Sequence, residues 1–173
     1  MTAAVAMLAA DGVERAHVEQ LRRTLEDAGL RVDLIGPRRG EIWAMDHLDK
    51  SATFPVDRPL RDAGVDDYDC LVIPGGVAGA DHLRRDPAAV ALVSDFVGAG
   101  KPVAAAGHAS WLLVEADLVR NRALACWPSI RTDVVNGGAM WIDDRVSVDA
   151  ALLTCPRTEN LPDLSRALIE ALD

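Results

Sequence analysis

The sequence predicts a single α/β domain over residues 1–173, with helices packed against a mostly parallel sheet. The main observation is that short apolar runs alternate along the chain with amphipathic stretches, as buried strands alternate with helices in such folds. The composition agrees with this class. The chain has 173 residues, of which 50% are hydrophobic and 26% are charged. This balance is typical of one globular domain and is too apolar for a disordered chain.

The predicted strands are short apolar runs that stop at turn-forming residues. Ala3–Ala10 is uninterrupted and stops at an Asp-Gly pair, and Cys70–Ile73 is closed by a Pro-Gly-Gly turn. Later runs are shorter and alternate apolar with polar residues. The predicted strands are Ala3–Ala10, Arg31–Ile35, Gly40–Met45, Cys70–Ile73, Pro102–Ala106, Thr132–Val135, Ala139–Ile142, Val146–Val148 and Leu152–Thr154.

Four stretches have the spacing of amphipathic helices. In Glu14–Ala28, apolar residues recur every three or four positions, and a glycine follows the last turn. Asp86–Val97 has a proline in its first turn, where a backbone N–H is not needed. The predicted helices are Glu14–Ala28, Asp86–Val97, Ala109–Val119 and Leu161–Leu172.

Charge and cysteine usage exclude several kinds of partner and site. The formal net charge of −9 disfavours nucleic acid and anionic membrane surfaces. The longest apolar run, Ala3–Ala10, is far shorter than the roughly 20 residues that cross a bilayer. The three cysteines, Cys70, Cys126 and Cys155, form no CxxC pair, so neither a disulfide scaffold nor a zinc ribbon is expected. We therefore expect a cytoplasmic protein with no metal, no cofactor, no nucleic-acid partner and no membrane association.

Functional groups are expected at the carboxyl ends of the parallel strands, where loops meet helix N-termini. Four segments occupy such places: residues 11–14, 74–82, 107–110 and 154–158. In the third, a strand runs directly into a helix through Gly107 and His108. Such an elbow displays a nucleophile in many enzymes and aims backbone N–H groups at one point. Gly107 has no side chain to display, so a tight turn that uses the conformational freedom of glycine is an alternative interpretation.

Six segments together carry a family resemblance. They are ADGVE (10–14), DDYDCLVIPGG (66–76), DHLRRDPAAV (81–90), GKPVAAAGHASWLLVEADLV (100–119), WPSIRTDVVNGGAMWID (127–143) and the closing Leu161-Pro162. With them the chain resembles the ThiJ/PfpI superfamily of the Parkinson-associated deglycase and the PfpI-type intracellular protease, and most closely its PfpI-like subgroup. The resemblance covers nearly the whole chain. It implies a flavodoxin-like three-layer sandwich and a homodimer or higher homo-oligomer.

The resemblance also implies that this chain departs from the family's chemistry. The family motif at the elbow is a cysteine followed by a histidine, and the matching pair here is Gly107-His108. Where the PfpI-like subgroup continues with Gly-Pro, this chain has Ala109-Ser110. Deglycation, glyoxalase and protease activity of the family type need a thiolate, so we expect none of them by that route.

The other expected site residues also follow from the resemblance. Glu14 matches the acid beside the family's thiol, His108 matches its histidine, and Asp81 matches the acid that orients this histidine. Two alternatives stay open: Asp11 and Glu14 have the spacing of a capping box, and His108 could be a helix-start histidine bonded to a loop. We expect Glu14, His108 and Asp81 as catalytic residues and a substrate pocket formed by Gly75, Gly76, Gly107, Ala109, Ser110, Trp111, Trp127 and Cys155.

Three functions remain open. In the first, Glu14 and His108 carry out hydration, hydrolysis or proton transfer on a small carbonyl-like or epoxide-like molecule, as a hydrolase or lyase without a cysteine nucleophile. In the second, the chain is an inactive paralogue, a pseudoenzyme that binds a small ligand or serves as a stress-related oligomer. In the third, Cys155 is a relocated nucleophile, although no helix N-terminus stands beside it to lower its pKa.

Overall fold

The core of the structure, a computed structural model that describes residues 2–172, is a seven-stranded sheet. Its strand order is β11-β12-β8-β7-β1-β3-β6, and every pairing is parallel except that of β11 with β12. The predicted mostly parallel sheet is therefore confirmed. The strands are β1 (Ala4–Leu8), β3 (Arg31–Gly36), β6 (Arg58–Pro59), β7 (Cys70–Ile73), β8 (Val103–Ala106), β11 (Ser147–Asp149) and β12 (Leu152–Cys155).

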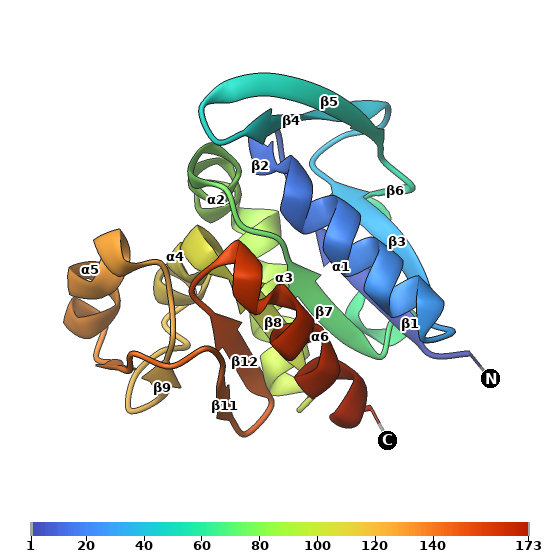
Figure 1. Cartoon of the computed structure of the whole chain (residues 1–173). Coiled ribbons are helices and arrows are strands. Elements are labelled where there is room, and N and C mark those ends of the chain that lie inside the picture. Colours follow the sequence, from blue (N-terminus) through green and yellow to red (C-terminus); the bar gives the residue numbers. More distant parts are fainter. Residues whose placement is uncertain (1, 173) are drawn as a thin grey trace.

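Helices cover both faces of this sheet, which gives a three-layer sandwich (Figure 1). Helices α1 and α6 contact each other on one face, and α2, α3 and α4 pack together on the other. The helices are α1 (Arg15–Asp27), α2 (Val77–Arg84), α3 (Pro87–Gly98), α4 (Ser110–Glu115), α5 (Arg131–Asn136) and α6 (Leu161–Glu170). In the described part of the chain, no helix combines the length and apolar character needed to cross a membrane.

Strand β1 shows why the central strands must be apolar throughout. Val5 and Met7 lie in the core under α1 and α6, whereas Ala6 and Leu8 lie in the core under α2, α3 and α4. Successive side chains of a strand point to opposite faces, so a strand covered on both faces buries every residue. All five residues of β1 are buried, which explains the uninterrupted run in the sequence.

Two smaller sheets complete the fold. Strands β2 (Val13–Glu14), β4 (Glu41–Asp46) and β5 (Asp49–Pro55) form a three-stranded sheet, and β9 (Ala123–Leu124) pairs with β10 (Met140–Trp141). The β4–β5 hairpin lies across the top of the molecule in Figure 1, next to the start of α1. It matters for function because its turn brings His47 and Leu48 to the carboxyl ends of the central strands.

Two predicted elements are wrong in detail. Residues 132–135, predicted as a strand from their β-branched side chains, belong to helix α5. A proline before this segment and two glycines after it are start and stop signals that outweigh the local β-propensity. The helix predicted over Ala109–Val119 consists of a 3-10 turn at Gly107–Ala109 followed by α4, which already ends at Glu115.

The two longest elements absent from the sequence prediction are β5 and α2, and the two-residue strands β2, β6 and β9 were not predicted either. Strand β5 is polar and mostly exposed, and only β4 pairs with it. Helix α2 was missed because it contains a glycine and has a weak apolar stripe. That glycine is required by packing: a Cβ at Gly79 would lie 2.9 Å from Cα and N of Val13, so α2 could not approach β2 so closely.

A truncation in the layer of α6 tests this architecture. Leu168→Ala removes a fully buried side chain from the core shared with α1, and we expect it to lower the free energy of unfolding by about 2–5 kcal/mol. The matched control Leu48→Ala, at a side chain that is 81% exposed, should change it by less than about 0.5 kcal/mol. Chemical denaturation of both variants measures the difference, and equal losses would contradict the placement of α6.

Candidate functional site

The elbow after β8 is a sharp turn in which a glycine, Gly107, occupies the position that faces the strand ends. β8 runs into the 3-10 turn at Gly107, whose φ of +58° lies in the left-handed region. A Cβ at this position would have the carbonyl oxygen of Pro156 at 3.6 Å and Cε1 of His17 at 3.9 Å, which are ordinary contact distances. The turn therefore leaves room for a side chain that the sequence does not supply.

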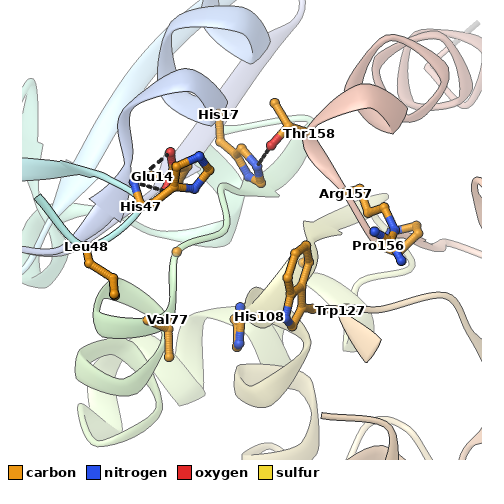
Figure 2. Close-up of a pocket in the computed structure, with 12 residues that line it drawn as sticks. Glu14, His17, His47, Leu48, Val77, His108, Trp127, Pro156, Arg157 and Thr158 are labelled. Atoms are coloured by element: carbon orange, nitrogen blue, oxygen red, sulfur yellow. Dashed lines mark hydrogen bonds between the residues drawn. The ribbon is translucent and has the colours of Figure 1, made fainter. Parts of the chain in front are cut away.

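The elbow opens into a cavity of about 220 Å³ at the carboxyl ends of the central strands (Figure 2). Residues from several separate segments line it: the start of α1, the β4–β5 turn, the start of α2, the elbow, and the loops before α5 and after β12. They are Glu14, His17, His47, Leu48, Gly76, Val77, Gly107, His108, Trp127, Pro156, Arg157 and Thr158.

Glu14 points into this cavity from the end of β2, immediately before α1. It is 9% exposed, and its two carboxyl oxygens lie 3.2 and 3.4 Å from the backbone N–H of His47, which donates to them. The alternative role as a helix cap is wrong, because its side chain makes no capping bond. Asp11 does not form the capping box either. It accepts hydrogen bonds from the backbone of Trp43 and the guanidinium of Arg38.

His17 lies one turn after Glu14 and is 5% exposed. Its Nδ1 accepts the backbone N–H of Gly75 at 3.0 Å, and its Nε2 lies 2.9 Å from the hydroxyl of Thr158 (Figure 2). Burial, together with the nearby His108, lowers the pKa of His17 from 6.5 to about 4. The ring is therefore neutral at pH 7. This residue was not identified from the sequence, although a three-residue spacing from Glu14 within the predicted helix Glu14–Ala28 would place both side chains on one side.

His108 stands on the opposite side of the cavity between two tryptophans. Its ring centroid lies 5.2 Å from that of Trp111 and 5.7 Å from that of Trp127. Burial lowers the pKa of His108 as well. Its Nε2 is 3.5 Å from the hydroxyl of Ser129. Asp81, expected to orient this ring, instead pairs with Arg84 at 2.9 Å, and within residues 2–172 it makes no contact of hydrogen-bonding length with His108.

Five expected site residues line the cavity and six do not. Glu14, Gly76, Gly107, His108 and Trp127 are brought together as the sequence indicated. The six that lie elsewhere are Gly75, Asp81, Ala109, Ser110, Trp111 and Cys155. Gly75 lies behind the ring of His17, and Ala109 and Ser110 are buried at the start of α4. Trp111 packs under Arg84 and donates its ring N–H to Asp133.

The three cysteines are buried and do not line the cavity. Cys155 is fully buried, and burial raises its pKa from 9.0 to about 12. The same cause raises the pKa of Cys70 to about 12 and that of Cys126 to about 11. A neutral buried thiol is a poor nucleophile. Both features argue against a relocated nucleophile at Cys155: its side chain is not among the lining residues, and burial holds its pKa well above neutral.

Several lining residues were not identified from the sequence. His47 and Leu48 come from a hairpin whose second strand was not predicted, so their approach to Glu14 could not be foreseen. Pro156, Arg157 and Thr158 belong to residues 154–158, which the sequence analysis selected because site residues lie at the carboxyl ends of parallel strands. That position was the one signal that pointed to them. Arg157 stacks its guanidinium 5.6 Å from the ring centroid of Trp127 and so forms one wall of the cavity.

Comparison with known proteins agrees with this architecture. The family model described as the DJ-1/PfpI family matches residues 3–171. The chain belongs to the DJ-1/PfpI family. It is 32% identical to protein/nucleic acid deglycase 2 of Escherichia coli strain K12 over 173 residues, which covers 99% of both chains. An uncharacterised protein of Archaeoglobus fulgidus is 39% identical over 116 residues, which is 67% of this chain and 68% of that protein.

Solved structures of DJ-1/PfpI proteins have the same fold. A two-domain protein from Anabaena variabilis, with a DJ-1/ThiJ/PfpI-like and a ferritin-like domain, superposes with a TM-score of 0.93 at 28% identity. The match covers 99% of this chain and 48% of that one, so this chain spans about half its length. DJ-1β of Drosophila melanogaster superposes with a TM-score of 0.91 at 21% identity, and the match covers 99% and 91% of the two chains. The flavodoxin-like sandwich is thereby confirmed.

The buried neutral histidine predicts a pH dependence of stability. The pKa of His17 is about 4 in the folded chain and 6.5 for a solvent-exposed histidine. Between these two pH values His17 is protonated in the unfolded chain and neutral in the folded chain. The free energy of unfolding should fall as pH drops through this window, by at most about 1.4 kcal/mol per pH unit from this group. Denaturation at pH 7 to 4 should show a shallower slope for His17→Gln, and an unchanged one for His82→Gln at an exposed histidine. Identical slopes for wild type and His17→Gln would contradict the assignment.

Proposed function

We propose that this cavity carries out cysteine-independent acid–base chemistry on a small molecule, with Glu14 as the group that takes up and returns the proton. The observation that supports this most is the placement of the Glu14 carboxyl and the space above Gly107 in one cavity, from which all three thiols are excluded. A side chain buried beside a reacting group and fixed by a hydrogen bond is suited to general acid–base catalysis.

The arrangement suits hydration, hydrolysis or proton transfer on a carbonyl-like or epoxide-like compound. In a hydration, Glu14 accepts a proton from water as the water oxygen bonds to the substrate carbon. The electron pair of the broken bond moves to the substrate heteroatom, which then takes the proton back. Backbone N–H groups of the elbow are oriented donors for charge that develops on that atom. His108 contributes a polar wall, and Gly107 leaves room for the substrate or the water.

Thiol chemistry is not part of the proposal. Deglycation is the activity named for the Escherichia coli relative. The family resemblance places a cysteine at the elbow, where this chain has Gly107. Members of the family are commonly oligomeric, and a homodimer or larger assembly remains our expectation for this chain. A cytoplasmic location also stays a prediction, as does the role first assigned to Asp81.

Replacing the carboxyl of Glu14 tests the proposal directly. Glu14→Gln keeps an oxygen that can accept from the His47 amide, but it cannot take up a proton. The wild type is first assayed on a panel of small carbonyls and epoxides. On any compound that it turns over, we expect the variant to be slower by about 100-fold or more. Glu19→Gln, on the half-exposed face of α1, is the matched control and should retain activity. Alkylating the thiols should also leave activity intact.

Two results would count against it. Full activity of Glu14→Gln would remove the carboxyl from the mechanism, and loss of activity on thiol alkylation would return a cysteine to it. If wild type turns over no compound of the panel but is stabilised against heat by one of them, the pocket belongs to a binding protein without catalysis.

Restoring a thiol at the elbow tests whether the scaffold still supports one. In Gly107→Cys, the nearest atoms leave ordinary contact distances around the new Cβ, although the positive φ is strained for a side chain, by about 1–2 kcal/mol. We expect a folded protein in which one thiol reacts rapidly with iodoacetamide under native conditions, detected by mass spectrometry. The native cysteines provide the internal control. A Gly107→Cys protein that is as unreactive as wild type would show that this position does not face the cavity.

A further inference from the structure

His17 and Thr158 form a hydrogen-bonded pair at one wall of the cavity. A backbone amide determines which of the two side chains donates in this bond. Gly75 donates its amide proton to Nδ1 of His17, and an amide can only donate there. A neutral imidazole with an unprotonated Nδ1 carries its proton on Nε2. That proton is directed at Oγ1 of Thr158, 2.9 Å away. The Thr158 oxygen is therefore the acceptor in this bond, and its own proton remains to be donated elsewhere.

The side chain of Thr158 lies where a ligand in the cavity can reach it. Thr158 is one of the lining residues, and Figure 2 shows its side chain beside His17 at the cavity wall. Among residues 2–172, His17 is its single side-chain hydrogen-bond partner. The acid–base chemistry proposed above does not use either side chain, so this buried histidine and its hydroxyl partner lack an assigned role.

We propose that His17 and Thr158 form a one-way hydrogen-bond relay that presents the Thr158 hydroxyl proton to an acceptor oxygen of the pocket ligand. Glu14, in the same cavity, accepts a hydrogen bond from a donor group of that ligand. His17 acts through Thr158 and is a positioning residue. The ligand class that fits is a small neutral molecule with a carbonyl oxygen beside an N–H or O–H group. This deepens the proposed function by naming the ligand class, and it rests on the same pocket.

The neutral state of His17 makes the relay effective. Because its pKa lies near 4, the ring stays uncharged over the ordinary pH range and the proton stays on Nε2. The groups that face this ring are few: His108 across the cavity, the Gly75 amide, the Thr158 hydroxyl and Glu14, which immediately precedes the same helix. A ligand oxygen therefore meets a donor that is fixed before binding, which reduces the entropy lost when it binds.

The first test needs no ligand. Long-range 15N NMR on the full chain labelled at histidine reports which ring nitrogen carries the proton. We expect the Nε2–H tautomer for His17, held from pH 8 to about pH 5, together with a coupling between Nδ1 and the Gly75 amide. An Nδ1–H tautomer at pH 7 would overturn the relay, because Thr158 would then donate its proton to Nε2 and not to a ligand. A charged ring at pH 7 would contradict the hydrogen bond from the Gly75 amide to Nδ1.

The second test uses acetamide as the probe, since it carries one carbonyl oxygen and an adjacent N–H donor and has no reactive group. Ligand-observed NMR titration should show saturable binding to wild type. Thr158→Val, which removes the hydroxyl at nearly constant shape, should weaken binding by about fivefold to tenfold. Thr158→Ser should remain within about twofold of wild type. His17→Leu should weaken binding by as much as Thr158→Val does. His17→Gln should retain part of the affinity, because glutamine can accept from Gly75 and donate to Thr158.

Other outcomes separate this proposal from the proposed function. Acetate, of the same size but negatively charged, should bind more weakly than acetamide because Glu14 lines the cavity. Equal binding of acetamide by Thr158→Val and wild type would overturn the relay, and absent or acetate-preferring binding would overturn the ligand class. If acetamide binding depends on Thr158 but no compound is turned over, the relay stands and the proposed catalysis fails.

Discussion

The site depends on the close approach of the α1 start to the Pro-Gly-Gly turn after β7. The backbone N–H of Glu14 donates to the carbonyl of Gly75 at 2.9 Å, and the Gly75 N–H donates to His17 at 3.0 Å. A Cβ at Gly75 would lie 2.8 Å from the His17 ring and from the carbonyl of Ala106, and one at Gly76 would lie 2.5 Å from the nitrogen of Glu14. The absence of side chains at these two positions thus lets the turn after β7 pack against the end of β8 and the start of α1. That contact holds both Glu14, just before α1, and His17 in its first turn.

The features predictable from the sequence are those encoded locally. The apolar run of β1 and the stripe of α1 follow from burial on one or both faces, and the topology rule places Gly107 and the segment after β12 at the same edge. The same rule selects the segments that contain Glu14 and His108, and the family resemblance then singles out these two residues within them. Residues 132–135 were misassigned because β-branched side chains favour a strand when tertiary packing is unknown.

The rest of the site depends on contacts between distant segments, which local patterns do not encode. His47 reaches Glu14 through a hairpin whose second strand is polar, and Thr158 reaches His17 across 141 positions of sequence. In the sequence, His17 cannot be distinguished from an ordinary histidine on the apolar face of a helix. Its role depends on the hydrogen bond from the Gly75 amide, which only the fold brings beside it. For Asp81 the family resemblance predicts a pairing with His108, whereas within the described chain a neighbouring arginine on α2 engages its carboxyl.

The burial of all three thiols has a consequence for the chemical durability of the protein. Peroxides and electrophiles attack thiolates, and Cys70, Cys126 and Cys155 are protonated at neutral pH and shielded by the core. With glycine at the elbow, the cavity offers these reagents no sulfur either. Oxidation of thiols therefore leaves the lining of the cavity unmodified, and a shift in the redox state of the surroundings changes no sulfur group there.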